Sequence, residues 1–505
     1  RTRRLVYNEI PIEDYETGDE KKDGKLNLSL YGTRDAAQNW TKEYTEYLVS
    51  MGFEIGIASP CSFAHHGKNI YMTVHGDDFT ATGPAASLEW LRDAMKRRYE
   101  ITAHMLGPGS NEEQEIRILN RTICWKSQCI TYEPDQRHAE LIIKEMGLDG
   151  GGIEHECNQQ HDRNQRERDS SHNQSAHHWH EHDCSHNQHA HHWQQPDRHQ
   201  RERDYSHNQC AHHWQQHDRH QRARDYSHNH RAHHRQQHAH DKRRTANAVS
   251  TPIVHEGPWA VGQRENSEPM GRADASRYRA LAARLNYLAL DRPDLQFTAK
   301  VASAQMAAPR EADWAVMKRA ARYLMGAPRA VQHFYWQSCV NMVTTFTDSD
   351  WAGDRATRKS TSGGVMCIGR HMIKSWSTTQ KNIALSSGEA ELYALVKGAS
   401  QTKGLMSMLR DFGVVTEGKI CTDASAAIGI SFRRGLGKVR HLDVQCLWIQ
   451  SEVTEGRLQV EKVHTKKNPA GLLTKAVSAE DIHKHLFALD VQLDTGRASK
   501  APRLQ

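Results

Sequence analysis

Hydrophobic residues recur at every third or fourth position in several segments of the chain, which predicts amphipathic helices. Five segments follow this spacing: 85–101, 136–148, 274–290, 312–326 and 388–413. In the third, the stripe consists of Tyr278, Leu281, Leu285 and Leu288. In the fourth, it consists of Trp314, Met317, Ala321 and Leu324, with Lys318, Arg319 and Arg322 on other faces.

Other segments favour strands. Residues 69–83 are β-rich on both sides of Gly76-Asp77-Asp78, which predicts a hairpin. After residue 340, strand-like and helix-like segments alternate in the order strands 343–347, 363–369 and 371–377, helix 388–413, strand 419–422, helix 440–453 and strand 458–465. Three consecutive strands followed by a helix and a further strand predict a mixed sheet with helices packed on it. The expected fold class is therefore mixed α/β.

The hydrophobic pattern stops at residues 151–249. This segment holds about two-thirds of the chain's 35 histidines, and residues 190–209 and 211–230 are almost the same text. Each repeat offers little apolar surface to offset the entropy of ordering, so we expect a disordered insert that grew by duplication. Dense histidine also binds zinc or nickel, so a histidine-rich metal sink is the alternative interpretation.

Composition adds a mild constraint. The 505 residues carry a net charge of +6, which permits a polyanionic partner without requiring one. Ten cysteines include no CxxC pair, which favours a reduced compartment. No apolar run approaches the ~20 residues of a membrane span, and no hydrophobic segment opens the sequence. We therefore expect an intracellular protein, cytoplasmic or nuclear, that is neither secreted nor membrane-bound.

Three acidic residues occupy the ends of predicted elements in the C-terminal sheet. Asp348 ends its first strand, and Asp423 follows the strand at 419–422. Ser386 and Glu389 fit a capping box that would begin the helix, which puts Glu391 in its first turns facing the sheet. Each acid alone is usually a turn residue or a helix cap. Together they predict a magnesium site, because Mg²⁺ prefers oxygen ligands and two such ions can clamp a phosphoryl displacement.

Several motifs resemble one family in its own order. "TDSDWAGDRATRKSTSGG", "WSTTQKNIALSSGEAELYAL", "CTDASAAIGI" and "RHLDVQCLWIQ" resemble the ribonuclease H domain of copia-type retrotransposon polyproteins. "LNLSLYGTRDAAQNW" and "VHGDDF" resemble that family's reverse transcriptase, and "SRYRALAARLNYLALDRPDL" and "MKRAARYLMGAP" resemble its connecting region. The resemblance implies a fragment of a longer Pol polyprotein that acts on an RNA–DNA hybrid or a template–primer.

The resemblance also implies roles for residues. Asp348, Glu391 and Asp423 match the ribonuclease H metal carboxylates, with Mg²⁺, or Mn²⁺, as the cofactor. Their neighbours Asp350 and Glu389 are expected to be supporting or solvent-facing. The family has a fourth metal aspartate in the segment that matches "NPAGLLTK", where this chain has Gly471. A glycine has no side-chain ligand, so we expect reduced or absent cleavage of the RNA strand.

For the polymerase half, the resemblance implies that Asp77 and Asp78 are the paired palm aspartates. They follow His75 and Gly76, where the family usually has an aromatic and a small apolar residue. The family's other metal aspartate lies just upstream of the segment matching "RRLVYNEIP", so we expect it and the fingers to be missing. Ala37 stands in place of a family proline, and Gly32 either lets a template approach or forms a plain turn. We therefore expect no polymerase activity.

The expected domains are a partial reverse transcriptase (1–150), the insert (151–249), a helical connection (250–335), a ribonuclease H-like domain (336–490) and a tail (491–505). The expected activity is two-metal hydrolysis of phosphodiester bonds in RNA–DNA hybrids. Two alternatives stay open: nucleic-acid binding without chemistry, and a decayed transposon remnant.

Overall fold

The computed structural model describes two short strands near the N-terminus and most of the chain after residue 34. The described residues are 7–9, 23–25, 35–148, 248–254, 264–338, 341–435, 447–499 and 501–502. Arg1–Met146 and Val249–Gln505 form one unit. Nearly all of the predicted insert lies outside the described residues. No described helix combines the length and apolar character that a membrane span needs.

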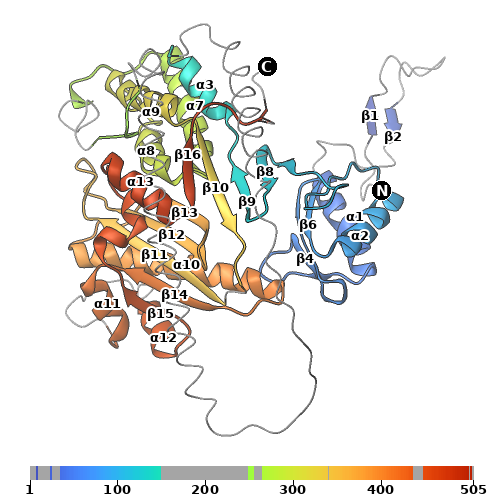
Figure 1. Cartoon of the computed structure of the whole chain (residues 1–505). Helices are drawn as coiled ribbons and strands as arrows, with labels where there is room; N and C mark the ends of the chain where they lie inside the picture. The colour runs from blue at the N-terminus through green and yellow to red at the C-terminus, as the bar shows by residue number, and fades with distance from the viewer. Residues whose placement is uncertain are drawn as a thin grey trace, which may run out of the picture. The chain divides into compact units, whose positions relative to one another are not determined.

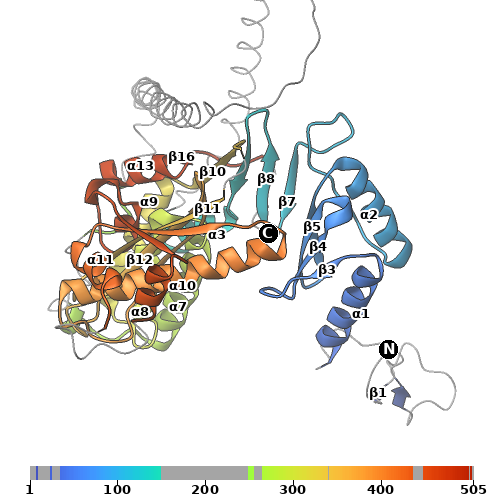
Figure 2. The ribbon, with the colours of Figure 1, turned by 90° about the horizontal axis from the view of Figure 1, so that it is seen from below.

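The first folded part is an antiparallel sheet with two helices. Its strands are consecutive, in the order β3 (Glu54–Ile55), β4 (Ser62–His65), β5 (Ile70–His75) and β6 (Asp78–Thr82). Helices α1 (Ala36–Ser50) and α2 (Ala85–Arg98) flank it in sequence, and β1 (Tyr7–Glu9) pairs with β2 (Asp23–Lys25) ahead of it. The core includes Leu48, Phe63, Leu91 and Met95. Figure 2 shows both helices beside these strands.

The predicted hairpin at 69–83 is confirmed. His75 pairs with Asp78, which leaves Gly76 and Asp77 as a two-residue loop between β5 and β6. Gly76 takes φ +66° at the first central position, where a type II′ hairpin turn requires a positive φ.

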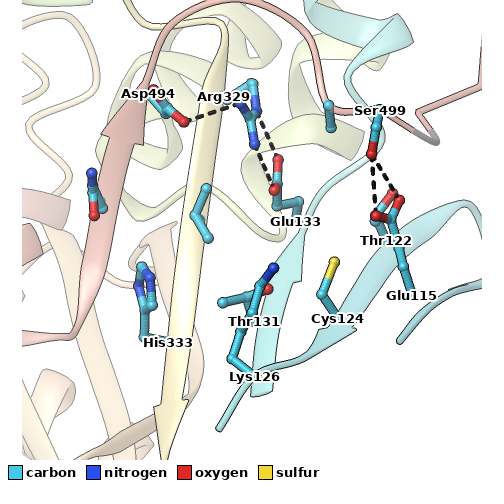
Figure 3. A pocket seen from close by; sticks show the side chains of 13 residues that line it. Glu115, Thr122, Cys124, Lys126, Thr131, Glu133, Arg329, His333, Asp494 and Ser499 are labelled. Atoms are coloured by element: carbon cyan, nitrogen blue, oxygen red, sulfur yellow. Dashed lines mark hydrogen bonds and ion pairs between the residues drawn. The ribbon is translucent and has the colours of Figure 1, made fainter. Parts of the chain in front are cut away.

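A second antiparallel sheet joins three distant parts of the sequence. Its strands lie in the order β16-β10-β9-β8-β7. Their bounds are β7 Glu115–Ile118, β8 Arg121–Trp125, β9 Cys129–Glu133, β10 Arg329–Tyr335 and β16 Val491–Asp494. Arg329, the first residue of β10, contacts Glu133 through two hydrogen bonds of 2.9 and 2.7 Å, and Asp494 at 3.0 Å (Figure 3). One guanidinium therefore ties together three strands.

The segment between β9 and β10 of the second sheet contains helices. They are α3 (Arg137–Glu145), α7 (Arg272–Ala289), α8 (Pro293–Ala304), the short 3₁₀ turn η4 (Glu311–Asp313) and α9 (Trp314–Gly326). The stripe predicted for 274–290 is confirmed, because all four of its members are buried. In α9 the prediction is wrong for Trp314, which is only half-buried because it lies at the N-terminal end of the helix.

The third sheet is mixed, as predicted. Its order is β13-β12-β11-β14-β15, with β11 antiparallel to β12, β12 antiparallel to β13, and β11, β14 and β15 parallel. The strands are β11 Met342–Asp350, β12 Thr361–Ile368, β13 His371–Thr379, β14 Glu417–Thr422 and β15 Gln459–Lys462. The accompanying helices are α10 Ser387–Asp411, α11 Ser425–Phe432, α12 Trp448–Thr454, η6 Thr465–Lys467, η7 Pro469–Leu473 and α13 Ala479–Ala488.

The long helix α10 lies along this third sheet, as Figures 1 and 2 show. Leu392, Leu395 and Ala399 of α10 pack with Ile420 of β14 in one core. The helix predicted at 440–453 is shorter where it is described, because α12 begins at Trp448 and residues 440–446 lie outside the described part. The last strand ends at Lys462 rather than at 465, where a 3₁₀ turn begins.

Candidate metal centre

Asp348 lies on the central strand of the third sheet. Strand β11 pairs with β12 on one side and β14 on the other, so its backbone groups are largely used in pairing. The Asp348 side chain is only 5% exposed, and its Oδ2 accepts a hydrogen bond from the hydroxyl of Thr474. The fold therefore holds a carboxylate inside the molecule, two residues before the end of the strand.

Glu391 is positioned by the start of α10. The Ser386 hydroxyl accepts a hydrogen bond from the Glu389 amide at 3.2 Å, as the predicted cap requires. Glu389 in turn accepts from the Leu385 amide at 2.9 Å and from the Tyr393 hydroxyl at 2.8 Å. Glu389 is 3% exposed, so of the two roles expected for it, supporting or solvent-facing, the structure agrees with the supporting one: its carboxylate is buried and hydrogen-bonded at the start of the helix. Glu391 follows half a turn later.

The Glu391 carboxylate has one satisfied oxygen and one without a partner. Its Oε1 accepts a hydrogen bond from the Ser349 amide at 3.2 Å, directly after Asp348. Its Oε2 is buried and has no hydrogen-bond partner among the described groups. A buried carboxylate oxygen with no donor is costly unless a proton or a cation is supplied.

Asp423 completes a group of three. It follows β14, which is parallel to β11, so the two strand ends meet at the same edge of the sheet. One oxygen from each of Asp348, Glu391 and Asp423 lies within 4.8 Å of the others. In the described part of the chain this is the one such cluster of acidic, histidine or cysteine side chains. The three acids chosen from the sequence therefore converge.

Burial and neighbouring charges raise the pKa values of Glu391 and Asp348. Burial, followed by the charges of Asp348 and Asp423, raises the pKa of Glu391 to about 8. Burial raises the pKa of Asp348 as well, against the opposing hydrogen bond from Thr474 and the charge of Lys475. Without a cation, Glu391 is therefore largely protonated at neutral pH.

Three converging carboxylates with a donor-free oxygen fit a divalent cation. Carboxylate oxygens are the ligands that Mg²⁺ and Mn²⁺ prefer, and a cation offsets the repulsion between neighbouring carboxylates. The residues at this site therefore suit a hard divalent ion.

Gly471 lies beside the same carboxylates. It belongs to η7, and a Cβ placed on it would lie 3.9 Å from Asp348 Oδ2, with no other atom within 4 Å. Its φ is not among the positive values, so an L side chain is compatible with the backbone there. A side chain at 471 would thus reach toward Asp348, which is where the resemblance expects a fourth aspartate.

Asp350 lies outside the cluster. Its Oδ1 accepts from the Thr361 amide at 2.6 Å, and its carboxylate interacts with Lys300 of α8. Burial raises the pKa of Asp350, while the Thr361 amide and Lys300 oppose that rise. Its described contacts anchor the turn that follows β11.

Asp77 and Asp78 are both exposed at the hairpin between β5 and β6. They take no part in a cluster of three ligand residues in the described chain. Gly32 lies outside the described residues, and Ala37 lies in α1. The structure therefore brings together the three ribonuclease H-like candidates and leaves the two hairpin aspartates apart.

Thr474 is a site residue that the sequence did not single out. It follows Gly471 by three positions and contacts Asp348 from η7's C-terminal side. Its position within "NPAGLLTK" could have indicated its role, because that segment already matched a metal-binding segment of the family. The sequence analysis considered the segment only for its missing aspartate.

A separate pocket of about 290 Å³ lies over the second sheet (Figure 3). Its charged groups are largely engaged with one another: Arg329 contacts Glu133 and Asp494, and Ser499 donates to Glu115. We assign no site there.

The third sheet and the three carboxylates define a ribonuclease H-like fold. The sheet has three antiparallel strands followed by two parallel ones, and its acids come from β11, from the start of α10 and from the residue after β14. LC11-RNase H1, solved in complex with an RNA/DNA hybrid, is 18% identical and covers 28% of this chain and 99% of its own, with a TM-score of 0.21.

The sequence is similar to Pol polyproteins of plant transposons. The Pol polyprotein of transposon RE2 from Arabidopsis thaliana is 30% identical over 239 residues, which are 46% of this chain and 16% of the relative. That of transposon RE1 from the same plant is 30% identical over 210 residues, 41% of this chain and 14% of the relative. No family model matches. The chain is therefore similar to retrovirus-related Pol polyproteins of copia-type transposons, which confirms the resemblance, and it spans 16% and 14% of the length of these two relatives.

Proposed function

We propose that the third-sheet region hydrolyses the RNA strand of an RNA–DNA hybrid with a divalent metal. The observation that carries the proposal is the convergence of Asp348, Glu391 and Asp423 within 4.8 Å. The similarity to transposon Pol polyproteins supports it. The proposed nuclease region is 336–490, which shares a hydrophobic core with Ala330 of β10 and Val491 of β16.

In this proposal each residue has a defined part. Asp348, Glu391 and Asp423 hold Mg²⁺, or Mn²⁺, through their carboxylates, and Glu391 gives up its proton as the ion binds. Thr474 keeps Asp348 in orientation through its hydroxyl. A bound divalent ion would activate a water and stabilise the leaving oxygen of the phosphodiester. With Gly471 in place of an acid, one of two ion positions lacks a ligand, so the rate is low.

A cleavage assay on the full chain tests this function. A fluorescent RNA–DNA hybrid is incubated with Mg²⁺ or Mn²⁺, and we expect slow, metal-dependent cleavage that Glu391→Gln abolishes. The glutamine keeps the shape of the side chain and removes its charge. Cleavage that survives in Glu391→Gln would come from a contaminant or another site and would contradict the proposal.

The Gly471→Asp variant tests the missing ligand. The Cβ position faces Asp348 Oδ2 without obstruction, so an aspartate fits. We expect the cleavage rate to rise about 10- to 100-fold, the range by which metal-site partners alter activity. The matched control is Gly471→Asn, which has the same shape without the charge and leaves the rate low. No gain in Gly471→Asp would show that the defect extends beyond this ligand.

The second candidate function is binding of nucleic acid without cleavage. The glycine at position 471 favours this candidate, because it supplies no side-chain ligand where the resemblance expects a fourth metal aspartate. In that case the chain holds the hybrid, and neither ion supports cleavage even in Gly471→Asp. Affinity should still fall steeply with ionic strength, because phosphate contacts release counterions. A flat salt titration together with no cleavage would leave the decayed remnant as the interpretation.

For the hairpin aspartates we propose no polymerase activity in this chain. Asp77 and Asp78 are exposed, and no third acid joins them in the described residues. Extension of a labelled primer on an RNA template by the purified chain would overturn this.

A further inference from the structure

The C-terminal segment forms an arm that packs on the second sheet. We define the arm as residues 491–502, of which residue 500 lies outside the described part of the chain. It begins with β16, the edge strand that pairs with β10. Beyond and within β16, its hydrogen bonds reach 165 to 384 positions back along the sequence, to four side chains. These side chains, which we call the acceptor surface, are Glu115, Gln136, Glu140 and Arg329.

Gln136 recognises the backbone of the arm. Its side-chain amide donates to the Gly496 carbonyl at 2.8 Å, and its side-chain oxygen accepts from the Ala498 amide at 3.1 Å. Gln136 is 5% exposed, and Ala498 and Ala501 of the arm are 9% and 8% exposed. Main-chain hydrogen bonds combined with buried side chains are how proteins bind an added extended segment. This part of the arm therefore packs as a bound peptide does.

The side chains of the arm add polar contacts. Arg497 donates to Glu140 at 2.7 Å, and these two side chains are 33% and 22% exposed. The Ser499 hydroxyl donates to Glu115 at 3.2 Å (Figure 3). Each of these contacts joins the arm to a segment far away in sequence. The arm of a second copy therefore makes the same contacts with the acceptor surface as the chain's own arm.

The hinge that carries the arm is short and strained. Leu489 and Asp490 are the two residues between α13 and β16. Asp490 has a φ of +55°, which is costly for a non-glycine residue, and its amide donates to the Phe487 carbonyl at 3.1 Å to close the turn. Two hydrogen bonds of 2.8 Å from Arg370 to the Asp490 carboxylate oppose opening of the turn. Short hinges under strain favour exchange of the element that they carry, because an extended hinge releases the strain.

We propose that the arm exchanges between two copies of this chain. In the exchanged form each arm packs on the acceptor surface of the other copy, which gives a symmetric homodimer. The contacts of the arm are the same in the closed chain and in the dimer, and only the hinge differs. The balance between the two forms therefore depends on the hinge and on the concentration of the chain. This proposal is independent of the proposed nuclease.

Two hinge variants of the full chain test the proposal. Asp490→Ala and Asp490→Gly both remove the carboxylate that Arg370 holds, but a positive φ strains only the alanine. A dimer releases the strain of two hinges, so we expect the dimerisation constant of Asp490→Ala to be roughly 30-fold above that of Asp490→Gly. Analytical ultracentrifugation measures both constants. Equal constants would overturn the proposal.

A charge exchange between two full-length variants tests where each arm lies. Arg497→Glu and Glu140→Arg each place like charges between the arm and its own acceptor surface. In a mixture, either arm meets the opposite charge only on the other variant. At equilibrium we therefore expect mixed dimers to exceed the two homodimers about tenfold, because two ion pairs are restored and four repulsions are avoided. Native mass spectrometry with one variant isotopically labelled measures these proportions.

The matched control reverses charges in a pair that belongs to one helix. Lys42 and Glu46 of α1 form an exposed ion pair at 3.3 Å, and exchange of the arm leaves this pair within its own chain. A mixture of Lys42→Glu and Glu46→Lys should therefore give mixed dimers only in statistical proportion. Statistical proportions for Arg497→Glu with Glu140→Arg as well, or no dimer in any variant, would overturn arm exchange. Neither measurement depends on cleavage, so failure of the nuclease proposal leaves these outcomes unchanged.

Discussion

At the scale of single residues, the surroundings of a carboxyl group decide whether it is ionised at neutral pH. Glu391 shows this most clearly, because burial and two adjacent aspartates raise its pKa from 4.5 to about 8. Between those values the folded chain holds a proton that the unfolded chain has lost. In the absence of a divalent ion, the free energy of unfolding should therefore fall as pH rises through this window.

Metal binding should show the opposite pH dependence. Because an ion must displace the Glu391 proton, Mg²⁺ affinity should rise between about pH 6 and pH 9, and binding at pH 7 should release protons. Calorimetric titrations in buffers of different ionisation enthalpy measure both quantities. In Glu391→Gln the proton release should largely disappear. Affinity that is constant across this range would show that Glu391 is not a ligand.

At the scale of elements, the long helix α10 must approach the third sheet closely to bring Glu391 to Asp348. Gly398 makes this approach possible, because a Cβ on it would lie 2.4 Å from Thr347 Cγ2 of β11. Gly404, on the same helix, has no neighbour within 4 Å of an added Cβ and is exposed. The two glycines thus have opposite consequences for stability.

Alanine at each position should separate these effects. Gly398→Ala should lower the free energy of unfolding by about 1–3 kcal/mol through overpacking, and it should weaken Mg²⁺ binding because the helix carries Glu391. Gly404→Ala should raise stability by roughly 0.5–1 kcal/mol, because it only removes backbone freedom. Urea unfolding measures both. Equal effects of the two substitutions would show that the helix does not depend on this contact.

At the scale of the whole molecule, the second sheet joins strands from residues 115–133, 329–335 and 491–494. Ala330, Val491 and Leu493 of that sheet pack in one core with Val365 and Cys367 of the third sheet. The boundaries expected at 336 and 490 would cut off β10 and β16 and expose this core. For that reason the assays above use the full chain.

The Arg329 ion pairs provide a test of this long-range connection. The side chains of Arg329 and Glu133 are 17% and 10% exposed, so losing one partner leaves a mostly buried charge. Arg329→Met should lower the free energy of unfolding by roughly 2–4 kcal/mol. Adding Glu133→Gln should recover part of that loss in a double-mutant cycle. The control is Lys42→Met in the exposed Lys42–Glu46 pair, which should cost less than about 1 kcal/mol.

The sequence by itself determined the local elements. Local contacts decide three features that the sequence predicted: the hairpin at Gly76, the cap at Ser386 and a buried helix stripe of Tyr278, Leu281, Leu285 and Leu288. Each depends on residues only a few positions apart, so the sequence pattern was enough to predict it. The mixed character of the third sheet and the three converging acids were also predictable, because the motifs lie in one family's order along the chain.

Only the tertiary structure decided which distant segments meet. No local sequence pattern predicted that β9, β10 and β16 share a sheet, because strand pairing depends on burial and on hydrogen bonds between residues far apart in sequence. In the same way, the burial of Glu389, the contact of Thr474 with Asp348 and the joining of Trp351 to Ala384 each depend on a partner in another segment. The protonation of Glu391 belongs to this second group, because a pKa is set by the charges and the solvent that folding places around the carboxylate.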